Sequence, residues 1–399
     1  MGEYSTPNGI GGIVSDGLFR WMRDIRRTIH ARPEIAFCET ETAALISGHL
    51  RALGIEHTTG VAKTGIVGWI SAKEGADGAP TVALRADMDA LPVFEGTGLP
   101  FASTTPGVMH ACGHDGHVAM LLGAAALLKE RPPAGNVVLI FQPAEEADGG
   151  ALKMIEEGAM EGVSAIFGLH IDNHFRTGQI GIKPSIASAY TDVFEVNITG
   201  RGGHAARPQE AVDAILIAVE FINRLHAIKA REVDPLLPSV INVGELHAGT
   251  VYNAVAHSAV LRGTIRTIEA ATRSRIIRRI NDTATALSAL HGAKVAITHT
   301  PGYPPIINHE RECGIAQDIA INLLGKDSVI HIPHPSLGGE DFAYFVQKTP
   351  GCFLRLGAAK AGCEYRPAHS PGFDFDEEAM RVGAVFLSEV VRAAVGRGG

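Results

Sequence analysis

The stretch that decides the fold and the chemistry is Met109-His-Ala-Cys-Gly-His-Asp-Gly-His117. The apolar run at residues 118–128 follows it at once and is typical of a buried helix. The polar cluster therefore lies on a glycine-containing loop at a helix start. Cys112 and His114 supply a thiolate and an imidazole, which suit Zn²⁺ or a neighbouring ion such as Mn²⁺. The alternative is a helix cap with incidental histidines.

Length, charge and cysteine content restrict the class of protein. The chain has 399 residues, enough for two domains. Its net charge is −8 and it carries no long basic run, which argues against nucleic acid or a membrane surface as a partner. The five cysteines are odd in number and scattered, which favours a reducing compartment over a disulfide framework. We expect a cytoplasmic protein without a signal peptide or a membrane span.

The first half of the chain alternates strands with helices. Residues 16–53 show helical periodicity up to Gly54, and further helices are expected after the His/Cys cluster and near residues 150–158. Continuous apolar runs predict buried strands at residues 66–70, 81–85, 136–141 and 164–169. This alternation predicts an α/β domain with a mainly parallel sheet and helices on both faces.

Polar side chains recur where these strands end. They are Asp87 and Asp89 after residues 81–85, Glu145 and Glu146 after residues 136–141, and His170 after residues 164–169. Ligands of open α/β sheets bind beyond the carboxyl ends of the strands, so these side chains should meet at one edge. A single such residue could be a turn or cap residue, but three strand ends beside Cys112 and His114 favour a functional site.

Residues 190–307 follow a different order, β-α-β-β-α-β, which predicts a ferredoxin-like α+β unit inserted into the larger domain. The expected division is a discontinuous catalytic, metal-binding domain at residues 1–189 and 308–399, and a lid and dimerisation domain at residues 190–307. The returning segment around residues 356–369 should bring His369 back to the site of the first domain.

Eight motifs occur in order along most of the chain. They are Arg85-Ala-Asp-Met-Asp-Ala-Leu-Pro92, His110-Ala-Cys-Gly-His-Asp115, Gln142-Pro-Ala-Glu-Glu146, Gly168-Leu-His170, Gly200-Arg-Gly-Gly-His204, Gly263-Thr-Ile-Arg266, Gly338-Gly-Glu-Asp-Phe342 and His369-Ser-Pro371. Through these motifs the chain resembles peptidase family M20, the aminoacylase and carboxypeptidase metallohydrolases. It looks closest to the N-acyl-amino-acid amidohydrolases related to hippurate hydrolase and to the indole-acetyl-amino-acid hydrolases that cleave auxin conjugates.

The resemblance implies two divalent metal ions per subunit, Mn or Zn, with Ni or Co as further candidates. Its implied ligands are Cys112, as a bridging thiolate, with His114, Glu146, His170 and His369. Glu145 matches the general acid/base, and Asp87 and Asp89 match supporting positions. Other branches of the family have His at the position of Asp87 and a bridging Asp at that of Cys112, so this difference refines the match and leaves the choice of metal open.

The resemblance also implies a substrate-binding role for the lid. His204, Asn253 and Arg266 match lid residues that meet the substrate, and in dimeric relatives the histidine reaches the neighbouring subunit's site. Gly338 and Gly339 lack side chains, so their backbone N–H groups can approach a substrate closely. We therefore expect a homodimer, or a tetramer built from dimers.

The expected function is hydrolysis of the amide bond of N-acyl-L-amino acids, which yields a carboxylic acid and a free amino acid. A carboxypeptidase or dipeptidase on the same scaffold is the alternative enzyme. A binding protein with a vestigial site is the non-enzyme alternative, and no expected ligand is missing to support it. His174 is expected at the surface, while His331 and His334 receive no assignment.

Overall fold

The computed structural model describes residues 13–72, 78–147 and 149–396, which fold into two compact units. The first contains the described residues up to Ala187, Ile306–His334 and the described residues from Asp341 onward. The second contains Ser188–Pro305 and Pro335–Glu340. None of the helices in the described part of the chain has the length and apolar character needed to cross a membrane.

An eight-stranded mixed sheet is the centre of the first unit in the described part of the chain, with the order β1-β2-β4-β3-β5-β16-β6-β15. The neighbours β4, β3, β5 and β16 run parallel, and their register aligns Arg85 with Ile140 on one side and Gly168 on the other. The strands are β1 (Glu56–Val61), β2 (Gly65–Ile70), β3 (Thr81–Asp87), β4 (Asn136–Gln142), β5 (Val163–Arg176), β6 (Ile180–Ile182), β15 (Val329–His331) and β16 (Gly351–Ala359). A short pair, β7 (Ser185–Ile186) and β14 (Ile307–Asn308), lies apart from this sheet.

Helices cover both faces of the sheet, because its strands are apolar on both sides. Leu139 of β4 packs into the core on one face, while its neighbours Val138 and Ile140 pack into a second core on the other. The helices of the first face are α1 (Asp16–Ala31), α2 (Thr40–Ala52), α3 (His114–Glu130), α7 (Glu310–Leu324) and α9 (Ala379–Gly396). Those of the second are α4 (Gly150–Glu156) and α8 (Phe342–Lys348). The predicted fold class is confirmed.

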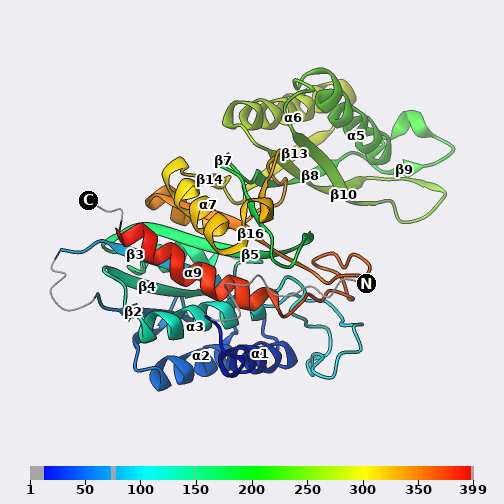
Figure 1. The fold of residues 1–399 in the computed structure, drawn as a ribbon. Coiled ribbons are helices and arrows are strands. Elements are labelled where there is room, and N and C mark those ends of the chain that lie inside the picture. The colour runs from blue at the N-terminus through cyan, green and yellow to red at the C-terminus, as the bar shows by residue number, and fades with distance from the viewer. Residues whose placement is uncertain (1–12, 73–77, 148, 397–399) are drawn as a thin grey trace. The chain divides into compact units, whose positions relative to one another are not determined.

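Helix α3 is buried nearly all round, since it packs against α1, α9 and β3 (Figure 1). A Cβ atom at Gly123 would lie 2.2 Å from the Met22 sulfur, so this glycine lets α3 and α1 approach closely. The deep position of α3 places the side chains at its N-terminus, which include His114, inside the molecule.

The helical periodicity of residues 16–53 is divided between two helices, α1 and α2. The chain leaves the α-helical path at Arg32-Pro33, because proline cannot continue a helix and restricts the residue before it. One sequence-based expectation for the first unit was wrong. His170 does not follow its strand but lies within it, since β5 continues to Arg176 along its parallel neighbour β16.

The second unit is a four-stranded antiparallel sheet with two helices, in the strand order β10-β12-β8-β13. With the helices between the strands, this is a ferredoxin-like arrangement. Its main elements are β8 (Tyr190–Thr199), α5 (Ala214–Arg231), β10 (Ser239–Ala248), β12 (Ser258–Thr267), α6 (Ala270–His291) and β13 (Lys294–Pro301). A small ribbon pairs β9 (Gly203–His204) with β11 (Ala254–Val255).

Helix α5 begins at Ala214, where a capping side chain fixes its first turn. Pro208–Glu210 forms a 3-10 turn, and the Asp213 side chain accepts a hydrogen bond from the Ile215 N–H, which caps the helix.

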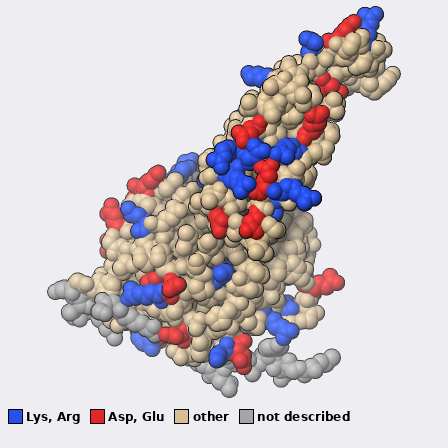
Figure 2. Space-filling model, turned by 90° about the horizontal axis from the view of Figure 1, so that it is seen from above, with Lys and Arg blue, Asp and Glu red and all other residues tan. Residues whose placement is uncertain are grey.

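On the face that Figure 2 shows, basic side chains are interspersed with acidic ones. Two arginines of α6 are paired with acidic side chains, since Arg273 lies 2.7 Å from Asp192 and Arg279 lies 2.6 Å from Glu232.

Candidate metal centre

The candidate site lies at the carboxyl ends of the central parallel strands. Asp87 is the last residue of β3, and Gln142, the last of β4, leads directly into Glu145 and Glu146. His170 extends from β5, next in the sheet, and the N-terminus of α3 supplies His114. The sheet topology therefore brings together residues from four separate segments, at the edge where α/β sheets bind ligands.

A sharp turn separates the two adjacent glutamates from the end of β4. Ala144 has φ 55, in the left-handed region that non-glycine residues seldom adopt, and its N–H donates to Glu39 Oε1 at 2.9 Å. The N–H of Glu146 donates to Asp89 Oδ2 at 2.9 Å. These bonds fix the backbone on both sides of Glu145, so each glutamate has a defined direction.

His114 presents its Nε2 atom to the site. Its Nδ1 lies 3.0 Å from the Asp89 carbonyl oxygen and 3.3 Å from Asp89 Oδ1, so Nδ1 carries the proton. Burial lowers the pKa of His114, but Asp87, the hydrogen bond to Asp89 and the nearby Cys112 outweigh burial and raise it well above 6.5. The surroundings of His114 Nε2 therefore favour a positive charge there, either a proton or a metal ion.

His170 is a neutral imidazole with the complementary arrangement. Its Nδ1 lies 2.6 Å from the Ile171 carbonyl oxygen, to which it donates, so Nε2 carries the lone pair. Burial, together with the charges of Arg355 and His117, lowers the pKa of His170 well below 6.5. The lone pair points toward the Cys112 sulfur, 3.4 Å away. Such a fixed tautomer is what a metal-binding histidine requires.

Burial and the charge of Glu146 raise the pKa of the Cys112 thiol to about 12. A thiolate at this position therefore needs a cation beside it, because a coordinated thiol loses its proton outright. This requirement fits the role of a metal ligand, and it does not fit a metal-free nucleophile, which needs a lowered thiol pKa.

His369 reaches the site from the loop between β16 and α9. Its Nε2 lies 3.2 Å from Glu146 Oε1, and its N–H donates to the Ala111 carbonyl oxygen at 2.7 Å. The hydrogen bond to Glu146 raises the pKa of His369. His369 differs from the other histidines of the site in two respects: its side chain is 55% exposed and its backbone is left-handed, with φ 63.

The five predicted ligands form overlapping groups that could each hold a metal ion. Within each group the ligand atoms lie within 4.8 Å of one another; the groups are Cys112 with His114 and His170, and Cys112 with Glu146 and His369. Glu145 joins His114 and Glu146 in a third group. Because Cys112 belongs to two groups, one thiolate could serve two ions. His114 Nε2 is buried without a hydrogen-bond partner and is aimed into this cluster of sulfur, nitrogen and oxygen donors, so the residues present fit a pair of divalent cations.

Sequence reasoning missed the network beneath the ligands. Asp87 accepts from Arg85 Nη1 at 2.7 Å and from His117 Nδ1 at 2.5 Å. His117 Nε2 in turn accepts the N–H of Ile171, the residue after His170, at 2.9 Å. The spacing of His117, three residues after His114 on one helix face, could have indicated its role. Both oxygens of Asp87 therefore accept hydrogen bonds within this network, and Asp87 also forms a group with His114 and His117 that could hold a metal ion.

The predicted residues of the second unit form two separate pairs. His204 lies opposite Ala254 in the β9–β11 ribbon, and the Ala205 N–H donates to the Asn253 carbonyl oxygen, so His204 and Asn253 are neighbours. Arg266 lies opposite Thr191 in β8. Gly339 lies against the same threonine, since a Cβ atom at Gly339 would be 2.8 Å from Thr191 Cγ2, so Arg266 and Gly339 form the second pair.

The two pairs lie toward opposite ends of the second unit's sheet. The β11 ribbon directly precedes Ser258, where β12 begins, and Arg266 is eight residues further along that strand. This corresponds to about 27 Å at about 3.4 Å per residue. The neighbouring Gly338 uses its N–H within its own loop, where it donates to Ser336 Oγ at 3.0 Å.

The model of Peptidase family M20/M25/M40 matches residues 83–393, which include all the site residues described above. The chain belongs to this family. Among its relatives are Thermostable carboxypeptidase 1 of Saccharolobus solfataricus, 40% identical over 92% of this chain and 93% of the relative, and IAA-amino acid hydrolase ILR1-like 2 of Arabidopsis thaliana, 39% identical over 93% and 84%. N-acetyl-L-cysteine deacetylase of Bacillus subtilis is 40% identical over 92% and 86%.

The family assignment agrees with a solved structure. The YXEP protein of Bacillus subtilis, described as a dinuclear metal-binding peptidase of family M20, has a TM-score of 0.82 and 34% sequence identity to this chain, over 96% of this chain and 99% of that one. The predicted family and enzyme class are thus confirmed. As a member of this family, the chain is a metal-dependent hydrolase that acts on amide bonds.

Proposed function

We propose that this enzyme hydrolyses N-acyl-L-amino acids to a carboxylic acid and a free amino acid. The observation that carries the proposal is the meeting of Cys112, His114, Glu146, His170 and His369 at one sheet edge, beside a second glutamate. The names of two relatives, an IAA-amino acid hydrolase and an N-acetyl-L-cysteine deacetylase, favour acylated amino acids as the substrate class.

The five ligands would hold two divalent ions, with the Cys112 thiolate as the bridge. Mn²⁺ and Zn²⁺ suit this mixture of sulfur, nitrogen and oxygen donors, as do Ni²⁺ and Co²⁺. When bound, such ions lower the pKa of a bound water from about 15.7 to about 7 and polarise the substrate carbonyl. Asp89 keeps His114 in the tautomer that exposes Nε2, and it also holds the backbone N–H of Glu146.

Glu145 would act as general base and then as general acid. It is buried, and one of its carboxylate oxygens lies within 4.8 Å of the ligand atoms of His114 and Glu146. In this role Glu145 takes a proton from the attacking water and gives it to the leaving amine. The fixed turn at Ala144 supports a division of labour, in which Glu146 binds metal and Glu145 faces the water.

Exchange of each glutamate for glutamine tests this assignment. Glu145→Gln should retain two metal ions per chain, measured by elemental analysis, and lose turnover by about 10² to 10⁴-fold, because an amide cannot carry the proton. Glu146→Gln serves as the matched variant and should lose metal, since a neutral ligand replaces a carboxylate. Near-normal kcat in Glu145→Gln would contradict the general-base role.

We infer that the second unit is a lid and dimerisation domain that binds the substrate from two chains. Arg266 offers a planar fork for the substrate's α-carboxylate, and the loop of Gly338 and Gly339 lies beside Thr191, the β8 residue opposite Arg266. His204 would stabilise the developing oxyanion, with Asn253 next to it. The separation of about 27 Å along β12 exceeds the length of an acyl-amino acid, which supports a homodimer in which His204 and Asn253 reach the partner's site.

Hybrid dimers test the origin of His204. Glu145→Gln and His204→Ala homodimers should each be inactive, and mixing them with subunit exchange should restore one working site per hybrid dimer. The regained activity is measured with an N-acyl-amino acid, and exchange is followed with differently tagged subunits. Exchanged mixtures without recovery would place His204 in its own chain's site or outside catalysis.

The identity to Thermostable carboxypeptidase 1 favours a carboxypeptidase or dipeptidase as the second candidate function. A comparison of kcat/KM for an N-acyl-amino acid, its C-terminal amide and a free dipeptide separates the candidates. We expect the amide to be much poorer, because a site built to pair a carboxylate is left with unpaired polar groups. Equal values for acid and amide would exclude carboxylate recognition, and a preference for dipeptides would favour the peptidase.

A further inference from the structure

Strand β5 continues past His170 into Asp172, Asn173 and His174, three polar residues that the proposed metal centre does not use. The side chains of Asn173 and His174 contact residues within 365–374, about 190 to 200 positions further along the chain. That segment contains His369. The two segments that supply these two histidine ligands are therefore joined by side-chain contacts outside the ligand set.

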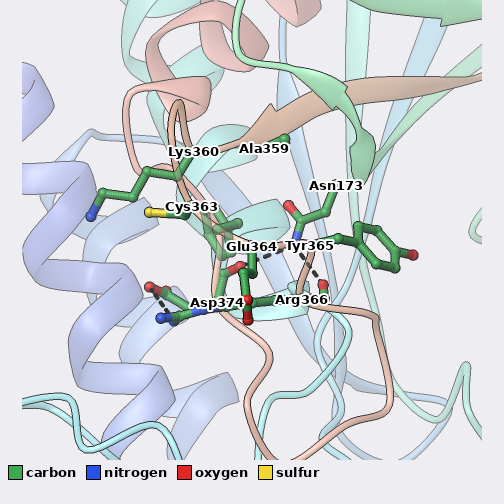
Figure 3. Close-up of a pocket in the computed structure, with 9 residues that line it drawn as sticks. Asn173, Ala359, Lys360, Cys363, Glu364, Tyr365, Arg366 and Asp374 are labelled. Carbon is green, nitrogen blue, oxygen red and sulfur yellow. Dashed lines mark hydrogen bonds and ion pairs between the residues drawn. The ribbon is translucent and has the colours of Figure 1, made fainter.

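The first contact is made by the Asn173 side chain. Its Nδ2 donates to the Arg366 carbonyl oxygen at 2.9 Å and to the Asp374 carbonyl oxygen at 3.0 Å. In Figure 3 this amide points toward the Arg366 and Asp374 backbone, and dashed lines mark both bonds. Because Arg366 precedes His369 and Asp374 follows it, a single amide ties both arms of the loop to β5.

The second contact is a chain of three side chains. Asp172 Oδ1 accepts from His174 Nδ1 at 2.7 Å and from the His174 backbone N–H at 2.9 Å. With its proton on Nδ1, His174 accepts the Tyr365 hydroxyl at Nε2, 2.9 Å away. The two rings also pack together, with centroids 4.7 Å apart. Tyr365 is thereby held in one orientation although it is half exposed.

The His369 loop needs such support more than the other ligands do. His114 is buried on helix α3 and His170 is set within a strand, whereas His369 is largely exposed and has left-handed φ 63. A non-glycine residue persists in that conformation only where its surroundings fix it. Near His369 itself, its N–H bonds to Ala111 and the Ser370 hydroxyl bonds to the Pro367 carbonyl oxygen.

We propose that Asn173, His174 and Tyr365 form a clip that positions His369 for metal binding. The clip anchors the His369 loop to β5, the strand that carries His170. The distance and orientation between the two histidines are therefore fixed. These three are positioning residues, since none of them belongs to the ligand groups. The inference rests on the proposed function only in that it takes His369 to be a metal ligand.

Two variants remove the clip's hydrogen bonds with little change in shape. Asn173→Asp abolishes the Nδ2 donor and sets a carboxylate against two carbonyl oxygens, and Tyr365→Phe deletes only the hydroxyl. Asn281→Asp is the matched control, because Asn281 also donates from Nδ2 to a carbonyl oxygen, that of Ile277 on α6 in the second unit. Metal-free protein is first examined by hydrogen–deuterium exchange, and Mn²⁺ is then titrated with the signal of the free ion as the readout.

Amides in residues 360–374 should exchange faster in Asn173→Asp than in wild type before metal is added. The second equivalent of Mn²⁺ should bind at least tenfold more weakly in Asn173→Asp and less markedly so in Tyr365→Phe, while the first equivalent is unchanged. Asn281→Asp should match wild type in both measurements.

Wild-type affinity for both Mn²⁺ equivalents in the two clip variants would overturn the inference, even with faster exchange in the loop. Equal weakening in Asn281→Asp would overturn it as well, because the effect would then be general. Failure of the proposed function looks different, since the wild type itself would not take up two Mn²⁺ ions. That outcome would overturn the clip's role in metal binding together with the dinuclear centre.

Discussion

His30 gives a test of the buried charge network that supports helix α3. It lies in the last turn of α1 with 1% exposure, with Nδ1 2.8 Å from Asp115 Oδ2 and Nε2 3.3 Å from Glu95 Oε1. Burial lowers the pKa of His30, but these two hydrogen bonds outweigh burial and raise it to about 9. In the folded protein His30 is therefore a cation between two carboxylates at neutral pH.

The sign and size of the effect on stability follow from linkage. The pKa of His30 is raised above its ordinary value of 6.5, so its contribution is complete below pH 6.5 and is lost as the pH rises through about 9. At about 1.36 kcal/mol per pKa unit, a rise from 6.5 to about 9 is worth about 3 kcal/mol of unfolding free energy.

The assay compares wild type with His30→Gln by urea unfolding at pH 6 and pH 10, with a chelator present so that metal binding does not contribute. The difference in unfolding free energy between the two proteins should be about 3 kcal/mol larger at pH 6 than at pH 10. His49→Gln is the control, because burial lowers the pKa of His49 and its contribution cannot fall over this range. If the difference in unfolding free energy between wild type and His30→Gln stays constant from pH 6 to pH 10, the raised pKa of His30 is refuted.

Cys112→Ala should lose metal and activity together, checked by elemental analysis and a hydrolysis assay; retention of two ions would contradict its role as the bridge. Arg85→Met should destabilise the chain by about 3–5 kcal/mol in urea unfolding, since it leaves Asp87 and Asp341 buried without this partner. Phe386→Ala, at a fully buried position in α9, should cost about 3–5 kcal/mol, whereas Phe94→Ala, at a residue 74% exposed, should stay within about 0.5 kcal/mol. Similar values for the two phenylalanine variants would argue against the packing described here.

Local sequence patterns predicted the strands and helices, because the spacing of apolar residues follows the local geometry of each element. Continuous apolar runs identified the buried strands of the parallel sheet, and the strand ends placed Glu145, Glu146 and Asp87 at one edge. The break between α1 and α2 was missed although Pro33 marks it, because the apolar periodicity continues on both sides of it.

Contacts between distant segments could not be predicted in this way. The bonds from Asn173 to residues 366 and 374 join positions about 190–200 apart, and no periodicity or turn signal refers to such a pairing. The separation of His204 from Arg266 depends on strand register, which was not predicted from the order of elements alone. The family resemblance supplied the ligand set but not the geometry that holds it.

In the proposed dinuclear centre, the protonated Cys112 thiol would make metal uptake an acid–base reaction. With a pKa of about 12, the thiol would have to release its proton before the sulfur could coordinate, so formation of the metal pair would displace one proton from Cys112 into solvent. At any pH below that pKa, this proton alone makes the apparent affinity for metal increase about tenfold for each unit by which the pH is raised. Mild acid should therefore weaken metal binding at this site. In the unloaded state the neutral, buried thiol resists alkylating and oxidising reagents, so the empty enzyme would keep its site intact until metal returns.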